Sequence, residues 1–408
     1  MTTDARGAGQ GKARALILLS AAELLGMSVW FSASAVVPAL TTAWGLGASG
    51  QAWLTMSVQL GFVAGALVSA LLNLADRIPA RAFFAASALL AGAATVLIPL
   101  AAQGPGTAIP LRFLTGLLLA GVYPVGMKIM ATWTRDDRGF GIGLLVGALT
   151  VGSAAPHLLK TLGGVDDWRT VLYLAAGLAG LGGVIALLLI REGPLRTSAP
   201  EFNWKYAAEV WRDKGLVLAN LGYFGHMWEL YAMWTWVPVF LLASFRVVGV
   251  GERGAAFAAF AVVAVGGLGC IVAGRLADRL GRTVVTAGSM AVSGLCSILA
   301  GFFFGGNVVP LVALCLVWGF AVVADSAQFS AGVSELCPPE RTGTVLTMQT
   351  SLGFLLTLVT IRLLPTVERL VTWRYAFAFL ALGPAVGIWA MFRLRRLPAS
   401  AKMAGGRR

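Results

Sequence analysis

Charged residues are scarce in this sequence. Asp, Glu, Lys and Arg make up 12% of its 408 residues, whereas 58% are hydrophobic. A water-soluble domain carries about a quarter charged residues. The composition therefore excludes a soluble enzyme and predicts a protein that folds in a lipid bilayer.

Acidic residues are the scarcer of the two signs, with 18 Asp and Glu against 31 Lys and Arg and a formal net charge of +13. In a soluble protein this excess would suggest nucleic acid as the partner. Here no basic helix or aromatic-basic platform lies outside the apolar runs, so we expect no nucleic acid partner. Retention of Lys and Arg on cytoplasmic loops explains the charge instead.

Cysteine and histidine are also rare, with four and two copies. The cysteines all lie in the second half of the chain, and no paired CxxC or Cys/His spacing is present, so we expect neither disulfides nor a metal site. The sequence has no nucleotide-binding loop and no Ser/His/Asp set, and its loops are short. We therefore expect no cofactor, no enzymatic activity and no ATP-driven step.

Long apolar runs dominate what is present. A helix needs about 20 apolar residues to span a bilayer, and twelve such runs are separated by charged or turn-rich breaks. The first follows Arg6, Lys12 and Arg14, as in a secretory signal, but it is too long for one and contains Glu23, so we interpret it as a spanning helix. The predicted spans are 15–41, 50–74, 81–102, 108–132, 139–162, 168–191, 215–243, 252–276, 282–304, 308–333, 342–364 and 372–393.

The longest connection runs from Glu192 to Lys214 and holds Pro194, Pro200 and a dense mixture of charges. It leaves six spans on each side, and residues 204–211 within it predict an interfacial helix. The predicted domains are a cytoplasmic tail (1–14), a six-helix bundle (15–191), a cytoplasmic linker (192–214), a second six-helix bundle (215–393) and a basic cytoplasmic tail (394–408).

Lys and Arg are distributed unevenly between alternate loops. With the amino terminus inside, most of the 31 fall in the tails, the linker and the even-numbered loops. The positive-inside rule then predicts a multi-pass protein of the cytoplasmic (inner) membrane with both termini in the cytoplasm. The opposite side holds Lys160, Arg169, Arg246, Arg253, Arg369 and Arg374.

The two halves repeat the same marks at an offset of about 200 residues, which indicates an internal duplication. The sequence LADR follows the second span at 74–77 and the eighth span at 276–279, and Trp-Arg opens both the sixth and the twelfth spans. We therefore predict an all-α integral membrane fold. Its twelve transmembrane helices would form two six-helix bundles, related by a pseudo-two-fold axis along the membrane normal and enclosing a central substrate path.

The segment 274–282 reads GRLADRLGR and resembles the signature loop between the second and third helices of each half of the major facilitator superfamily of secondary transporters. The first-half copy, 72–81, has Leu72 and Pro79 where that family usually has Gly. The resemblance covers the chain from about Lys12 to Arg396 and implies a transporter that works by alternating access.

The resemblance also implies that the two loops form a cytoplasmic gate. An Asp at the end of one helix can face the positive amino-terminal end of a neighbouring helix, and Arg side chains can reach acidic groups, so that the bundles are latched in the outward-facing state. A solvated turn that only fixes topology is the alternative. The predicted gate residues are Asp76, Arg77, Arg81, Gly274, Asp278, Arg279, Gly281 and Arg282.

Arg112 lies inside the fourth span and, with Gly116 and the pair Ala120-Gly121, resembles the Arg-x-x-x-Gly motif of the same family. The resemblance implies a role in proton coupling. Because Arg112 is near the start of the span, the alternative is that its side chain extends to the outer surface.

Three acids, Glu23, Glu229 and Asp325, lie well within predicted spans. A charged carboxylate is costly in hydrocarbon, so each could exchange a proton during transport; static pairing with a base or a neighbouring helix is the alternative. Glu229 is the leading candidate, because it lies near the middle of its span and shares a helix face with His226. We do not expect this pair to bind metal. The predicted proton-coupling residues are Glu229, Glu23, Asp325, Arg112 and His226.

Aromatic residues could floor a cavity for a planar or amphipathic solute, although each could equally pack in the core or at the lipid interface. Lys128, short of the end of the fourth span, could attract an anion. The predicted cavity residues are Trp30, Phe31, Gln59, Tyr123, Lys128, Trp228, Tyr231 and Trp234.

Together these features predict a proton-coupled, alternating-access secondary transporter that moves a small organic anion or another small metabolite. The expected partners are that solute, protons and the lipid bilayer, and we expect a monomer. The alternative is a proton-driven antiporter that exports cationic or lipophilic drugs.

Overall fold

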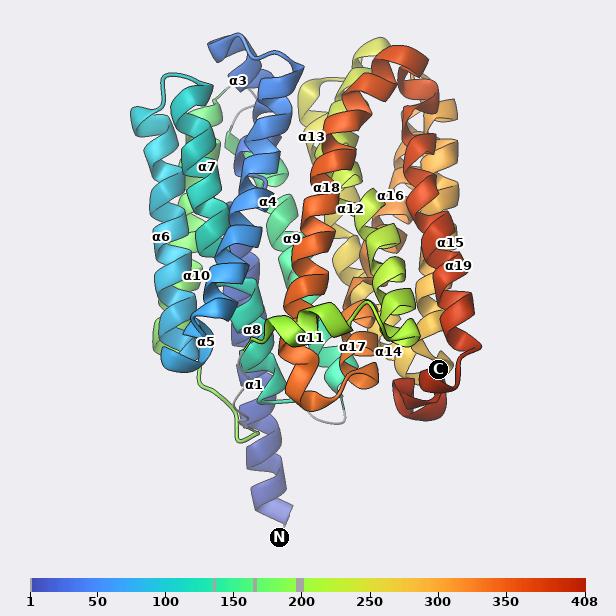
Figure 1. The fold of residues 1–408 in the computed structure, drawn as a ribbon. Coiled ribbons are helices and arrows are strands. Elements are labelled where there is room, and N and C mark those ends of the chain that lie inside the picture. The colour runs from blue at the N-terminus through green and yellow to red at the C-terminus, as the bar shows by residue number, and fades with distance from the viewer. Residues whose placement is uncertain (1, 135–136, 164–166, 196–201) are drawn as a thin grey trace.

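The computed structural model describes residues 2–134, 137–163, 167–195 and 202–408, and these residues form helices joined by short loops (Figure 1). The first bundle contains α1 (Thr2–Met27), α2 (Ser32–Ala35), α3 (Val37–Trp44), α4 (Ala48–Leu71), α5 (Leu74–Arg77), α6 (Ala80–Ala101), α7 (Pro105–Leu119), α8 (Tyr123–Ala131), α9 (Arg138–Gly163) and α10 (Trp168–Leu189).

The short helix α11 (Trp204–Glu209) belongs to the connection between the bundles. The second bundle contains α12 (Lys214–Val247), α13 (Glu252–Ala264), α14 (Gly266–Leu280), α15 (Arg282–Leu299), η1 (Ala300–Phe303), α16 (Val308–Ala324), α17 (Ser326–Leu336), α18 (Pro339–Ala376), η2 (Phe377–Ala381), α19 (Leu382–Arg395) and η3 (Pro398–Gly406).

Ten helical stretches of the described chain are long and apolar enough to cross a membrane. The last, Glu340–Arg395, has 56 residues and contains both final predicted spans, which separate at Thr372, where φ is 61°. The first predicted span is divided between α1, α2 and α3 by a break at 28–31. Counting these two cases brings the spans to twelve, and the predicted twelve-helix membrane fold with two six-helix bundles is confirmed.

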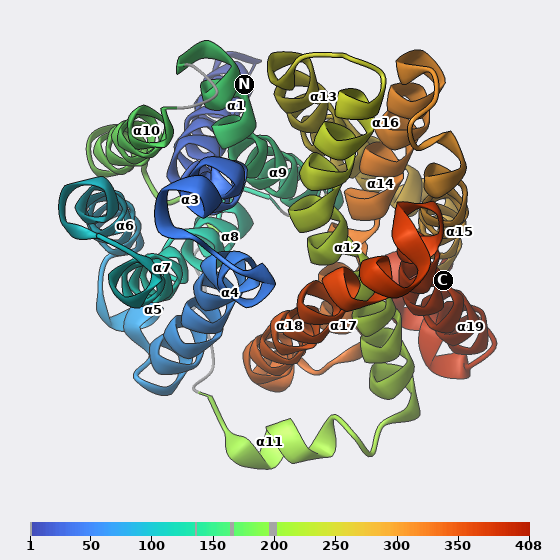
Figure 2. The same ribbon diagram turned by 90° about the horizontal axis from the view of Figure 1, so that it is seen from above.

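The bundles meet along two sets of helices, α4 with α18 and α9 with α13 and α14. Figure 2 shows them side by side, with α11 running outside both. Glycines set the close approach of α9 to α14. A Cβ added at Gly143 would lie 2.8 Å from the carbonyl oxygen of Cys270, and one at Gly147 would lie 2.9 Å from that of Gly267. Small residues therefore hold these backbones together, as in other membrane helix pairs.

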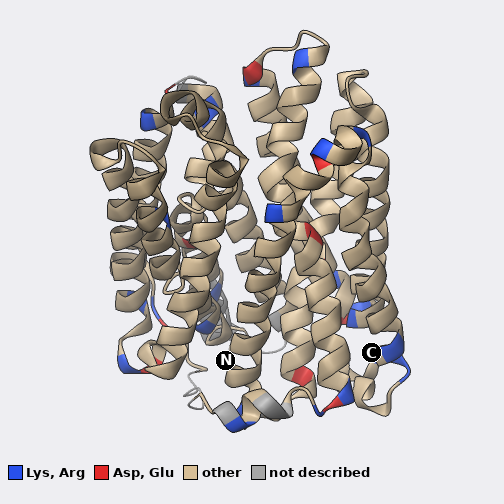
Figure 3. Cartoon of the chain, turned by 45° about the horizontal axis from the view of Figure 1, so that its top comes forward, with Lys and Arg blue, Asp and Glu red and all other residues tan. Residues whose placement is uncertain are grey.

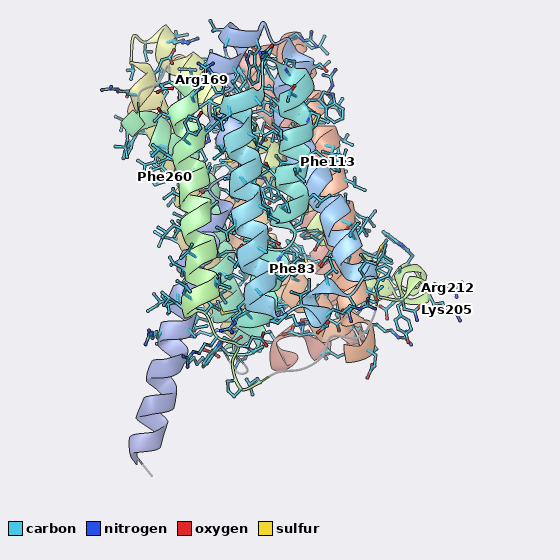
Figure 4. All side chains as sticks on the ribbon, turned by 90° about the vertical axis from the view of Figure 1, so that its left-hand side faces the viewer. Phe83, Phe113, Arg169, Lys205, Arg212 and Phe260 are labelled. Carbon is cyan, nitrogen blue, oxygen red and sulfur yellow. The ribbon has the colours of Figure 1, made fainter. Side chains whose placement is uncertain are left out.

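Both chain termini lie at one end of the molecule (Figure 1), here named the termini end; α3 lies at the opposite end. Charged residues gather toward the two ends and are sparse between them (Figure 3). Figure 4 places Arg169 at the opposite end and Lys205 and Arg212 near the termini end. This distribution suits helices whose middle sections face hydrocarbon.

The linker is tied to the second bundle by its backbone. The side chain of Asn203 caps α11 by accepting a hydrogen bond from the Lys205 N–H at 2.9 Å, and the Asn203 N–H donates to Thr344 Oγ1 of α18 at 3.1 Å. The observed helix ends at Glu209, two residues before the end of the predicted interfacial helix. Residues 196–201 of the predicted linker lie outside the described residues.

Candidate functional site

A cavity of about 260 Å³ lies between the two bundles, toward the termini end. The first bundle lines it with residues of α4, α5 and α8, including Tyr123 and Lys128, and the second lines it with residues of α17 and α18, including Ser330 and Thr350. Both halves of the internal repeat therefore contribute residues to one cavity.

A smaller cavity of about 40 Å³ continues from the first. The two share Tyr123, Ser330 and Thr350, and the smaller one is also walled by Tyr231 and Trp234. Of the described residues that line the smaller cavity, none is charged. The two cavities form a path from the termini end toward aromatic side chains in the middle of the molecule.

Aromatic rings from both bundles pack together beyond this path. The ring centroids of Trp30 and Phe354 lie 5.6 Å apart, those of Trp30 and Tyr231 6.0 Å apart, and those of Phe31 and Trp234 6.0 Å apart. Each of these pairs joins one bundle to the other. Edge-to-face and tilted contacts at this spacing are favourable for aromatic rings, so the cluster separates the cavity from the opposite end.

The predicted cavity residue Gln59 reinforces this closure. Gln59 Oε1 accepts a hydrogen bond from Thr357 Oγ1 at 2.8 Å, which links α4 to α18, and both side chains are buried. On the opposite-end side of the aromatic cluster, a pocket of about 20 Å³ lies between the bundles, against about 260 Å³ toward the termini end. The path is therefore wider toward the termini end.

Trp228 differs from its prediction as a cavity residue. Its Nε1 donates to the carbonyl oxygen of Phe379 at 3.4 Å, and its ring packs on the Phe379 ring at 5.2 Å, so it contacts η2 and lines neither cavity described above. The physical reason is helix geometry, because each step of three residues along an α-helix rotates a side chain about 60° away from its starting face.

Arg112 is fully buried and binds the break in the first span. Its Nη1 donates to the carbonyl oxygen of Val29 at 2.8 Å and to Ser32 Oγ at 3.2 Å, its Nη2 donates to the carbonyl oxygen of Trp30, and its Nε donates to that of Leu54 at 3.3 Å. The carbonyls of Val29 and Trp30 lie in the break between α1 and α2, outside regular helix, and in a bilayer such carbonyls need other donors; the carbonyl of Leu54 belongs to α4. The alternative interpretation, a side chain that reaches the outer surface, is wrong.

Glu23 is fully buried in the first bundle, and neither carboxyl oxygen has a hydrogen-bond partner within the described part of the chain. Its Oε2 faces Gly126 of α8, where an added Cβ would lie only 2.7 Å away. Because Gly126 is three residues after Tyr123, one face of α8 connects this carboxyl to the cavity wall.

Glu229 occupies a different setting, inside the second bundle. It accepts a hydrogen bond from Ser293 Oγ at 2.7 Å and another from Trp318 Nε1 at 2.8 Å. These donors come from α15 and α16. Glu229 lines neither cavity, and the sequence did not indicate its two partners because they lie far along the chain.

His226 pairs with Asp325 and not with Glu229. The distance between His226 Nδ1 and Asp325 Oδ1 is 2.8 Å, and both side chains are buried. Asp325 stands at the junction of α16 and α17, directly before Ser326, which lines the smaller cavity. This ionisable pair is therefore next to the solute path.

Lys128 lines the cavity but is already neutralised. Its Nζ forms an ion pair with the carboxylate of Asp76 and donates to the carbonyl oxygen of Ala75 at 2.5 Å. Asp76 belongs to the first copy of the signature loop, so this copy binds within its own bundle. The predicted gate residues Arg77 and Arg81 lie at the end of α5 and the start of α6, and no hydrogen bond or ion pair of the described residues joins them to the second bundle.

The second copy of the loop reaches the other bundle. A Cβ added at Gly139, at the start of α9, would lie 2.7 Å from either carboxylate oxygen of Asp278, and one at Gly274 would lie 2.9 Å from the carbonyl oxygen of Gly139. A carboxylate near a helix amino terminus is favourable because it faces the positive end of the helix dipole. Gly281 follows with φ of 94°, a conformation that favours glycine.

Arg282 anchors this loop to its own bundle. It donates to both carboxylate oxygens of Glu335 at 2.7 and 2.6 Å and to Gln328 Oε1 at 2.6 Å. The backbone N–H of Ala404, in η3, donates to Glu335 Oε2 at 3.0 Å. Arg279, the remaining predicted gate residue, lies in the last turn of α14. The geometry therefore supports a latch more strongly in the second copy than in the first.

Two six-helix bundles around a central path that is wider at one end are typical of secondary membrane transporters. The sequence model of the Major Facilitator Superfamily matches residues 18–361, and the chain belongs to this family of transporters. The fold is also similar to that of a crystal structure of a mutant of the nucleoside transporter NupG, with a TM-score of 0.70 and 16% sequence identity over 93% of this chain and 99% of that chain. No curated protein matches the sequence.

Proposed function

We propose that this protein is a proton-coupled secondary transporter that carries a small organic metabolite by alternating access. The supporting observation is the path between the bundles, which both halves line and which aromatic rings from both halves close on one side. Rocking of the bundles about such a site would expose it to each side of the membrane in turn.

The cavity lining favours an uncharged solute over an organic anion. Among the described residues that line the two cavities, Asp76 and Lys128 are the charged ones, and they neutralise each other. The remaining walls offer aromatic faces and the hydroxyl groups of residues such as Ser330 and Thr350. A solute with a flat ring and hydrogen-bonding groups suits these walls without leaving a charge unpaired.

Two buried groups beside the path are proposed to exchange protons. Glu23 lacks a hydrogen-bond donor among the described residues, so its charged form is costly there and the protonated form is favoured. The pair of His226 and Asp325 can accept or release a proton as its contacts change. Glu229 is held by two donors inside one bundle and is a weaker candidate, while Arg112 supports the first span.

A second candidate is export of cationic or lipophilic drugs in exchange for protons. The observation that favours it is the unpartnered carboxyl of Glu23, which in its charged form would attract a cation toward the aromatic walls. The two candidates differ in whether the solute competes with a proton for Glu23: a cationic drug would, and an uncharged metabolite would not.

We also propose that the termini end faces the cytoplasm and that the protein lies in the inner membrane. The support is the sequence distribution of Lys and Arg, which predicts the orientation by the positive-inside rule.

A thermal-shift screen of the purified protein in detergent tests the proposal first, with uncharged ring compounds, carboxylates and lipophilic cations at two pH values. Binding to the folded state raises the melting temperature by mass action. We expect uncharged ring compounds to stabilise the protein, and the best of them to enter proteoliposomes faster when a proton gradient is imposed. Uptake at the same rate with and without a proton gradient would contradict proton coupling. Stabilisation by lipophilic cations alone, stronger at high pH, would favour the second candidate.

A further inference from the structure

A second hollow, of about 830 Å³, lies at the termini end of the first bundle, beside the central cavity, with which it shares Ala75, Asp76 and Lys128. It is bounded by α5, the start of α6, α8 and the residues that follow α10. Its lining includes four basic and two acidic side chains, which are Arg77, Arg81, Lys128, Arg191, Asp76 and Glu192.

The charges around this hollow do not cancel. Asp76 forms an ion pair with Lys128, and Glu192 also has an interaction partner. Within the described chain, the side chains of Arg77, Arg81 and Arg191 form no ion pair or hydrogen bond. Three guanidinium groups around one space repel one another unless an anion lies between them, and the planar guanidinium matches the oxygens of a phosphate group.

The hollow also lies where helices long and apolar enough to cross a membrane end. Arg77 and Arg191 follow the spans that end at Leu71 and Leu189, and Arg81 lies in the first turn of the span Ala80–Ala101, so all three arginines lie near the ends of membrane-crossing helices. Leucines just inside those ends are exposed, with Leu71 at 50% and Leu188 at 69% of their maximal surface, as suits side chains that meet acyl chains. Basic pockets in this position attract anionic headgroups.

We infer that the hollow binds a phosphate group and that its source is the headgroup of an anionic phospholipid. Its three free guanidinium groups hold the phosphate, and the exposed leucines contact the acyl chains. The bound lipid lies beside Asp76 and Lys128, which line both this hollow and the central cavity, so lipid occupancy supports the loop at the mouth of the solute path.

The test measures the melting temperature of the full-length protein in a neutral detergent, titrated with dioctanoyl phosphatidylglycerol, dioctanoyl phosphatidylcholine or inorganic phosphate at constant ionic strength. We expect phosphatidylglycerol to raise the melting temperature in a saturable manner and phosphatidylcholine to have little effect. The substitutions Arg81→Gln and Arg191→Gln, made singly, should each weaken the apparent affinity about fivefold, the gain expected for one basic side chain near an anionic surface. The triple variant with Arg77→Gln in addition should abolish the shift.

The matched control removes three other arginines from the termini end, Arg212, Arg393 and Arg396, each changed to Gln, and should retain the shift. An equal shift with inorganic phosphate, lost in the hollow variants, would support the phosphate site but assign it to a soluble ligand and overturn the lipid source. Absence of any shift in the unmodified protein, or an equal loss in both triple variants, would overturn the site itself. The single variants keep the test valid if the triple variant does not fold.

Discussion

The guanidinium of Arg112 donates a hydrogen bond to the backbone carbonyl oxygen of Val29, 2.8 Å away. This contact joins α7 to the break in the first span, at the point where the chain turns toward Trp30 and Phe31 of the aromatic cluster. A charged side chain in the membrane is therefore used to satisfy backbone oxygens, and no acid of the described chain pairs with it in the structure. Arg112 thus has a positioning role for the side chains that close the solute path.

Arg112→Lys is expected to destabilise the protein, because an ammonium cannot reproduce the spread of donors of the guanidinium and leaves buried carbonyls unsatisfied. The cost should be about 1–3 kcal/mol, seen as a lower melting temperature in detergent. Arg253→Lys, at an exposed position of the opposite end, should leave the melting temperature unchanged. Equal stability of both variants would contradict the role assigned to Arg112.

Glu229→Gln is expected to lower stability by about 1–2 kcal/mol, because the amide nitrogen of Gln cannot accept a hydrogen bond from Ser293 or Trp318. If Glu229 only holds these helices together, solute-driven proton movement in proteoliposomes should persist at reduced protein yield. A double-mutant cycle with Ser293→Ala measures the coupling. A variant of full stability that loses proton coupling would reassign the proton to Glu229.

Glu23→Gln should mimic the protonated carboxyl and therefore fold with little loss of stability, since the native side chain has no hydrogen bond to lose among the described residues. We expect solute binding to persist but to lose its dependence on pH, and transport to stop responding to a proton gradient. Titrations of solute affinity at several pH values check this result. An unchanged pH profile would remove Glu23 from the coupling mechanism.

Lys128→Gln separates an uncharged solute from an anionic one. If Lys128 serves mainly to pair with Asp76, the variant should lose at most about 1 kcal/mol of stability, as for other partly exposed ion pairs, and solute affinity should change little. If Lys128 binds an anionic solute, loss of a charge-assisted hydrogen bond should weaken affinity about tenfold or more. The double variant with Asp76→Asn controls for the carboxylate left without a partner.

Gly143→Val tests the packing of α9 on α14. Its first side-chain atom would lie 2.8 Å from the carbonyl oxygen of Cys270, which is backbone and cannot move aside. We expect the two bundles to separate at this contact, with a lower melting temperature and slower transport. Gly177→Val is the control, since no atom lies within 4 Å of its added Cβ, and it should behave like the unmodified protein.

Much of the fold could be predicted because its signals are local. Hydropathy locates the spans, and the repeated LADR segments and the signature loop identify two related halves and their family. The cavity residues Tyr123, Tyr231 and Trp234 were also predicted. The break at 28–31 was not predicted, because a helix interrupted within an apolar run has no hydropathy signal of its own.

The partners of the polar side chains could not be predicted in the same way. The sequence suggested that His226 and Glu229 share a helix face, yet His226 pairs with Asp325 and Glu229 with Ser293 and Trp318. In each of these three contacts the two residues are separated by 64 to 99 positions in the sequence. Which faces of two distant helices meet depends on the rotation of each helix about its own axis.

The sequence by itself determined that the chain crosses a membrane in two six-helix halves, because apolar length and repeated loop residues are properties of short segments. Only the tertiary structure decided which charged side chains have a hydrogen-bond or ion-pair partner. In the structure, Lys128 pairs with Asp76 and Arg112 donates hydrogen bonds to carbonyls at the break in the first span. Glu23 has no hydrogen-bond donor among the described residues. The physical reason is that the cost of a charge in a bilayer depends on the groups within a few ångströms, and helix packing brings those groups together from distant parts of the chain.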